Sequence, residues 1–168
     1  TGAVEVNTNA SVTAAGNFGT GIRATGGRGG VKVNIGSGAS VMGGWQADLA
    51  SVGELSGLPA SGVFLGVTGG GTSTLTNDGS IGALSDRAIA GDPVIINNGT
   101  VTGFVQFTGG NNSFTNNGGF DLRHFADTTG DGVRDTLRVA VADMGTGAGN
   151  TFTNNGTQAL APVSGATQ

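Results

Sequence analysis

Cysteine is absent from the 168 residues, and proline occurs only 3 times. Without cysteine the chain has no disulfide scaffold, no zinc–thiolate site and no thiol chemistry. Scarce proline, together with glycine that does not recur at every third position, excludes a collagen-like chain. No run approaches the roughly 18 consecutive apolar residues of a membrane-spanning helix, so we expect no transmembrane segment in this chain.

Basic residues are also few. The chain has 7 Lys and Arg residues against 11 Asp and Glu residues, which gives a formal net charge of −4. Nucleic-acid binding normally requires a concentrated basic patch, so we expect no nucleic-acid partner.

Glycine, in contrast, is abundant, with 35 copies. Each glycine inside a helix costs about 1 kcal/mol relative to alanine, so the composition disfavours helices. Hydrophobic residues still make up 36 % of the chain, which is too many for a simple disordered linker. Short strands and tight turns remain, and the composition therefore predicts an all-β fold.

A turn motif recurs along the chain. Its copies are Asn77-Asp78-Gly79, Asn97-Asn98-Gly99, Asn116-Asn117-Gly118 and Asn154-Asn155-Gly156. The first three copies follow one another at a period of about 19 to 20 residues, which is typical of a solenoid. The gap before the last copy is twice as long, and we interpret it as two periods.

Each motif follows a short alternating run of the kind that forms a strand with one buried face. An asparagine-glycine hairpin would need a matching partner strand within a few residues, whereas the similarity lies a full period away. We therefore expect equivalent strands to stack in parallel. One inward column would contain Leu75, Ile95 or Ile96, Phe114 and Phe152, and the corner asparagines would form a hydrogen-bonded ladder.

Two further repeats support this interpretation. The segments Val4–Asn7 and Ala10–Val12 recur as Val31–Asn34 and Ala39–Val41, with two extra residues between the halves of the second copy. Another strand type precedes several turns, at residues 21–24, 62–66, 87–91 and 103–107. Two or three strands per turn of the coil follow. At this period the chain would hold about eight turns, fewer after insertions.

The sequence thus predicts one domain, residues 1–168, that forms a right-handed parallel β-helix. The hand follows the general preference for right-handed parallel crossovers. Two segments break the period. We expect a lateral loop or short helix at residues 44–58 and a charged loop insertion at residues 121–143, which holds 8 of the 18 charged residues.

The charged insertion contains a candidate calcium loop. Oxygen ligands at positions 1, 3, 5, 7 and 9, with glycine at position 6, are what a hard cation needs. These ligands would be Asp127, Thr129, Asp131, the carbonyl of Val133, and Asp135. Position 12 is Arg138 where a glutamate would complete the shell, so we favour the alternative of an acidic turn paired with Arg134 or Arg138.

The sequence offers three other candidate functional sites. His124 is the only histidine, and without a nucleophile motif beside it we expect a structural role. Trp45 would anchor the loop or plug the core, with an apolar platform for a sugar or a protein as the alternative. A polysaccharide-acting groove would use the charges at Asp121, Arg123, Asp127, Asp131, Arg134 and Asp135. Solvated loops are commoner on solenoids, so we propose no catalytic residue and expect no cofactor.

The glycine-rich coils, with their valine-x-valine-asparagine and asparagine-asparagine-glycine turns, resemble the passenger domains of bacterial autotransporters, the type V secreted proteins of Gram-negative bacteria. The resemblance is closest over residues 62–157. It implies a right-handed parallel β-helix that is exported through a carboxy-terminal membrane barrel of a longer precursor.

The resemblance also implies a function. We expect a non-enzymatic structural or adhesive segment at the cell surface, associated with the outer membrane or secreted. Its partners would be host or neighbouring-cell surfaces, glycans or further copies of itself. The alternatives are a self-assembling extracellular filament or matrix subunit and, third, a polysaccharide-acting enzyme.

Overall fold

A computed structural model of the protein describes residues 2–46, 60–126, 129, 131, 133, 136–137 and 140–160. All regular elements in this part of the chain are β-strands. In chain order they are β1 (Val4–Thr8), β2 (Val12–Thr13), β3 (Thr20–Gly26), β4 (Val31–Ile35), β5 (Ser40–Gly43), β6 (Ser61–Val67), β7 (Ser73–Asn77), β8 (Ser80–Ala83), β9 (Arg87–Gly91), β10 (Pro93–Asn97), β11 (Thr100–Thr102), β12 (Phe104–Phe107), β13 (Ser113–Asn116), β14 (Gly119–Leu122), β15 (Phe125–Ala126), β16 (Thr136–Leu137), β17 (Ala142–Asp143), β18 (Thr151–Asn154) and β19 (Thr157–Leu160).

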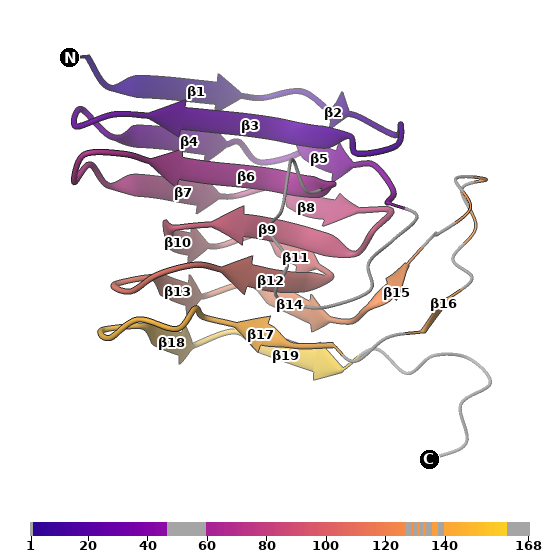
Figure 1. Ribbon diagram of the computed structural model, residues 1–168. Coiled ribbons are helices and arrows are strands. Elements are labelled where there is room, and N and C mark those ends of the chain that lie inside the picture. The colour runs from indigo at the N-terminus through magenta and orange to yellow at the C-terminus, as the bar shows by residue number, and fades with distance from the viewer. Residues whose placement is uncertain are drawn as a thin grey trace.

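Three parallel sheets form the faces of one coil (Figure 1). The first sheet has the order β1-β4-β7-β10-β13-β18, the second β2-β5-β8-β11-β14-β19, and the third β3-β6-β9-β12-β17. With the amino terminus at the top of Figure 1, the chain runs rightward through β1 behind and returns leftward through β3 in front while it descends. This path is right-handed, so the expected right-handed parallel β-helix is confirmed.

Strand alternation places one set of side chains inside the coil. The central column of the first sheet consists of register partners, namely Val6, Val33, Leu75, Ile95, Phe114 and Phe152. Ile95 is fully buried, whereas Ile96 is 45 % exposed, so Ile95 is the column member. Burying one such side chain stabilises the fold by about 1.5–3 kcal/mol, so the stacked column contributes substantially to the stability of the coil.

The repeats that the sequence shows are in register in the structure. Val4 pairs with Val31 in the first sheet, and Val12 pairs with Val41 in the second. The two extra residues of the second copy lie between these strands and do not disturb either register. The second strand type forms the third sheet, where Val63 pairs with both Ile22 and Ile89.

The interpretation of the last, double-length gap as two turns is wrong. β13 pairs directly with β18, with Phe114 opposite Phe152, so the whole segment is one turn. The charged insertion adds to this turn a length close to one period, which made the gap resemble two periods. The first sheet has six strands, in line with the expectation of about eight turns, fewer after insertions.

The insertion leaves the coil over a narrower range than residues 121–143. Asp121 and Leu122 belong to β14, which pairs with β19, and Ala142 and Asp143 form β17 of the third sheet. Between them, β15 and β16 form an antiparallel pair that extends away from the coil (Figure 1). Of the expected loop at residues 44–58, positions 47–58 lie outside the described residues.

The described residues contain no helix with the length and apolar character needed to cross a membrane.

Candidate functional site

An asparagine ladder runs inside the corner between the first and second sheets. The Nδ2 atom of Asn77 donates to Oδ1 of Asn97, Asn97 to Asn116, and Asn116 to Asn154, each at 2.7 Å. The same Nδ2 atoms also donate to backbone carbonyls of the next turn, at 3.0–3.2 Å. The buried amides are thus paired, which removes most of the cost of placing polar groups in a core.

A second ladder lies outside the first. Asn98 donates to Asp78 at 2.8 Å, Asn117 to Asn98 at 3.0 Å, and Asn155 to Asn117 at 3.0 Å. These side chains are exposed, so water competes for the same bonds and each contributes less to stability. The expected ladder is confirmed, and it is double.

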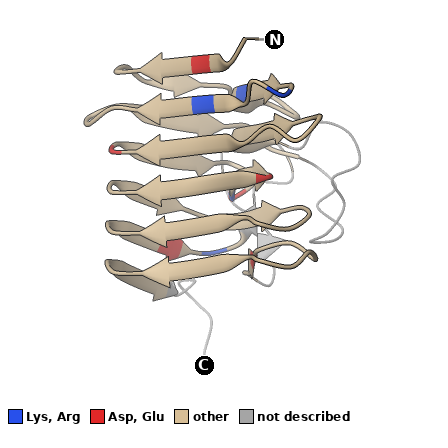
Figure 2. Cartoon of the chain, turned by 90° about the vertical axis from the view of Figure 1, so that its left-hand side faces the viewer, with Lys and Arg blue, Asp and Glu red and all other residues tan. Residues whose placement is uncertain are grey.

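The outer face of the first sheet is uncharged over its lower four turns. Figure 2 shows charged residues within this face only on its two upper strands. There Nζ of Lys32 lies 3.5 Å from Oε1 of Glu5 in an exposed ion pair. The outward side chains below are Thr74, Thr76, Val94, Ile96, Ser113, Thr115, Thr151 and Thr153. Hydroxyl and aliphatic groups on a flat, rigid sheet suit contact with a neutral surface.

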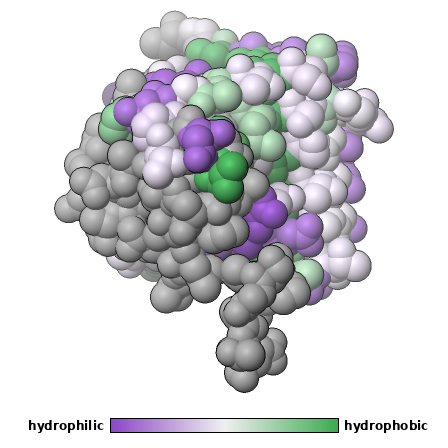
Figure 3. Space-filling view, turned by 90° about the vertical axis from the view of Figure 1, so that its right-hand side faces the viewer, coloured by the Kyte–Doolittle hydropathy of each residue, from purple (hydrophilic) through white to green (hydrophobic). Residues whose placement is uncertain are grey.

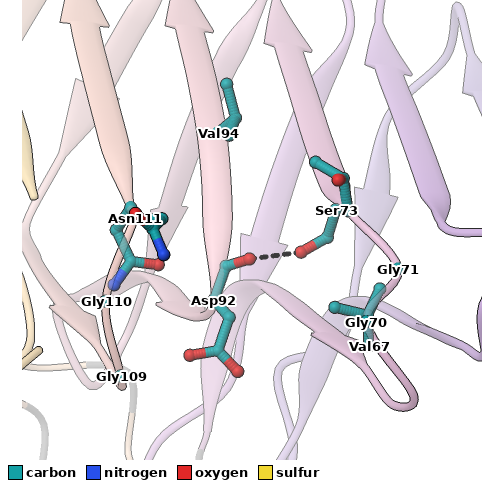
Figure 4. A pocket seen from close by; sticks show the side chains of 11 residues that line it. Val67, Gly70, Gly71, Ser73, Asp92, Val94, Gly109, Gly110 and Asn111 are labelled. Carbon is teal, nitrogen blue, oxygen red and sulfur yellow. Dashed lines mark hydrogen bonds between the residues drawn. The ribbon is translucent and has the colours of Figure 1, made fainter. Parts of the chain in front are cut away.

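A notch interrupts the corner between the third and first sheets. β9 and β10 are joined by one residue, Asp92, whereas the turns above and below span residues 68–72 and 108–112. The two longer turns project on either side of the short one and enclose a volume of about 490 Å³. Its lining residues are Val67, Gly70, Gly71, Thr72, Ser73, Asp92, Val94, Gly109, Gly110, Asn111 and Asn112 (Figure 4).

Local backbone geometry explains the short corner. Gly91 has a φ of +110°, and a Cβ atom there would lie 1.7 Å from the carbonyl oxygen of Leu65. Only glycine permits this bend. The backbone carbonyl of Asp92 accepts a hydrogen bond from Ser73, and its carboxylate accepts one from the Thr108 hydroxyl, so the corner is tied to both neighbouring turns.

A layer of buried charged groups lies at the opposite corner, between the second and third sheets. Asp86 is fully buried and accepts a hydrogen bond from Nε of Arg123 at 3.1 Å. Arg87 is also buried, donates to Oε1 of Gln46 at 3.3 Å and lies 5.6 Å from the ring centre of Phe104. Burial in the core lowers the pKa of the Arg87 guanidinium from its ordinary value to about 10.

Figure 3 shows the side of the molecule that carries this corner. Strongly hydrophilic and strongly hydrophobic residues lie next to each other on this side. Asp86 and Arg87 are buried and hydrogen-bonded at this corner, so these groups act first on stability.

The calcium loop falls only partly within the described residues. Asp127 and Asp135 lie outside them, while Thr129, Asp131 and Val133 are exposed. The carboxylate of Asp131 accepts a hydrogen bond from the backbone N–H of Val133 at 2.8 Å, which is the geometry of an aspartate turn. The described residues include no group of three or more His, Asp or Glu side chains that could hold a metal ion.

The other candidates are placed as follows. His124 is 3 % exposed, and its ring centre lies 4.2 Å from that of Phe104, which fits the expected structural role. Trp45 is half-buried and its carbonyl accepts a hydrogen bond from the N–H of Phe18 at 2.9 Å. Of the charges proposed for a polysaccharide-acting groove, Arg123 is paired with Asp86 rather than with Asp121 or Asp131.

Sequence reasoning missed both corners. The segment Gly91-Asp92-Pro93 is a turn signal, but only the lengths of the neighbouring turns make it the floor of a notch. Arg87 and Asp86 lie next to a strand-forming run, and a sequence alone does not show that the coil buries them. Comparisons of the chain with protein-family models, curated proteins and solved structures found no match.

Proposed function

We propose that this chain is a non-enzymatic structural or adhesive segment of a cell-surface or secreted protein, a passenger segment of an autotransporter-like outer-membrane protein. The observation that carries the proposal is the double asparagine ladder, whose inner rungs link four successive turns of the coil. A coil held in this way is a stiff rod with a repeating surface, which suits a stalk or an adhesive face.

Two other features support the proposal. The lower four turns of the first sheet present a flat, uncharged surface of hydroxyl and aliphatic side chains, which suits broad contact with another surface (Figure 2). The buried Asp86 is paired with the partly exposed Arg123, and the buried Arg87 contacts Gln46 and Phe104. The resemblance of the repeats to autotransporter passengers supplies the location at the outer membrane.

Adhesion of the folded chain tests the adhesive role. Beads coated with the purified protein should adhere to cells of the producing species or to host cells, and heat-unfolded protein on matched beads should not. If beads coated with folded protein, beads coated with unfolded protein and uncoated beads adhere equally, the adhesive role is contradicted and the role of a structural stalk is retained.

A filament or matrix subunit is the second candidate, and one observation favours it. The outer face of the first sheet repeats uncharged hydroxyl and aliphatic side chains from β7 to β18, which suits contact between copies of the chain. Sedimentation velocity decides: assemblies that lengthen with concentration support self-assembly, and a strict monomer at high concentration contradicts it.

A further inference from the structure

We propose that the notch at Asp92 binds a positively charged amino sugar of a surface glycan. The inference rests on the proposed adhesive function and names the chemistry of one contact. The notch has a volume of about 490 Å³, which falls within the range of small-molecule sites. It opens on the outside of a corner of the coil, where a glycan chain has access.

The charge of the ligand follows from Asp92. This residue carries the only ionisable side chain in the lining, and its carboxylate points out from the corner between the two projecting turns (Figure 4). One oxygen accepts the Thr108 hydroxyl, and the two ion pairs found among the described residues involve other carboxylates. A carboxylate in a chain of net charge −4 attracts a cation and repels an anion.

The shape of the ligand follows from the rest of the lining. Val67 and Val94 offer apolar contact of the kind that the C–H face of a sugar ring makes, while Thr72 and Asn111 offer hydroxyl and amide groups for sugar hydroxyls. Glycines in both turns leave the backbone open to a ring. A simple alkylammonium chain, such as a lysine side chain, would leave most of this volume empty, so the notch favours a hydroxylated ring that carries an amine.

The test measures binding of a β-1,4-linked glucosamine tetramer to the folded chain by calorimetry and by amide chemical shifts. The tetramer should bind, shift the amides of residues 108–112, and bind about tenfold more tightly than its N-acetylated counterpart, which has no charge. Asp92→Asn should lower the affinity about tenfold, while Asp78→Asn should leave it unchanged. Asp78 is the matched control because it makes the same change of charge at an exposed corner and retains an acceptor for Asn98.

Three results would overturn the inference. The first is no binding at millimolar tetramer, and the second is an equal loss in both variants, which would indicate general charge attraction. The third is tighter Asp92-dependent binding of a lysine-rich peptide, which would assign the notch to protein amines. Circular dichroism of each variant shows that it is folded. Because bead adhesion and surface location are measured separately, failure here leaves the proposed function standing.

Discussion

Asn97 donates its side-chain amide to Oδ1 of Asn116 at 2.7 Å, and neither side chain has any exposed surface. The two residues lie 19 positions apart, and their strands pair in register. These hydrogen bonds form only when successive turns have the same rise and their strands are in register. The ladder therefore depends on the regularity of the coil and also stabilises it.

The ladder predicts that replacing Asn97 destabilises the fold much more than replacing its neighbour Asn98. Asn97→Ala removes the acceptor of the Asn77 Nδ2 group and the donor to Oδ1 of Asn116, both inside the core. It should lower the free energy of unfolding by about 2–4 kcal/mol. Asn98→Ala removes an exposed pair and should cost less than about 1 kcal/mol. Urea unfolding measures both, and equal losses would contradict an internal ladder.

The one-residue corner predicts that Gly91 cannot be replaced. Gly91→Ala places a Cβ against the Leu65 carbonyl at a φ of +110°, and should destabilise the chain by more than about 3 kcal/mol or prevent folding. Gly27→Ala is the control, since a Cβ there meets nothing within 4 Å. Thermal unfolding of the two variants tests this, and a stable Gly91→Ala protein would show that the corner has another geometry.

The assignment of residues 113–154 to one turn can be tested by crosslinking, because the chain has no cysteine of its own. Thr115 and Thr153 are register partners, so Thr115→Cys with Thr153→Cys should form a disulfide on mild oxidation. Thr115→Cys with Thr151→Cys is shifted by two residues, which places the Cα atoms about 8 Å apart, and should not. Mass spectrometry reads the outcome, and crosslinking of the shifted pair would refute the register.

Replacing Arg87 should change the free energy of unfolding by an amount that does not depend on pH near neutrality. Its pKa in the folded protein, about 10, lies below that of the unfolded chain, so the folded state binds fewer protons and its penalty is relieved only as the pH rises through about 10. Arg87→Met keeps contact with Phe104, and Oε1 of Gln46 still accepts the N–H of Ala60 at 3.3 Å.

Arg87→Met should therefore differ from the native chain by about 1 kcal/mol or less, and the difference should stay constant from about pH 6 to 9. Arg87→Ala, which removes the packed stem as well, should cost about 2–4 kcal/mol. Urea unfolding across this range checks both variants. A difference that grows with pH below 9 would mean that another group titrates at this corner.

The parallel coil and its ladder were predictable because each turn is a local copy of the last. Val4 and Val31, or Asn97 and Asn116, occupy the same place in a repeated pattern, and stacking follows from the pattern alone. The single long turn between β13 and β18 was not predictable, because the length of an insertion says nothing about whether it continues the coil. Only the pairing of Phe114 with Phe152 reveals this.

The two corners were hidden for a different reason. The notch at Asp92 exists because the turns on either side are longer, and the burial of Arg87 and Asp86 depends on strands far away in the sequence. Both are properties of several turns together. A repeat analysis, which compares one turn with the next, has no signal for them.

Location on the cell tests the central claim most directly. An immunoblot with antibody to this chain would examine intact cells treated with external protease, outer-membrane fractions and culture medium. We expect a band much larger than 16.3 kDa in the outer membrane that the protease trims. A band that stays inside the cell and is protected from protease would contradict the proposal, and a released band near 16.3 kDa would favour the filament subunit instead.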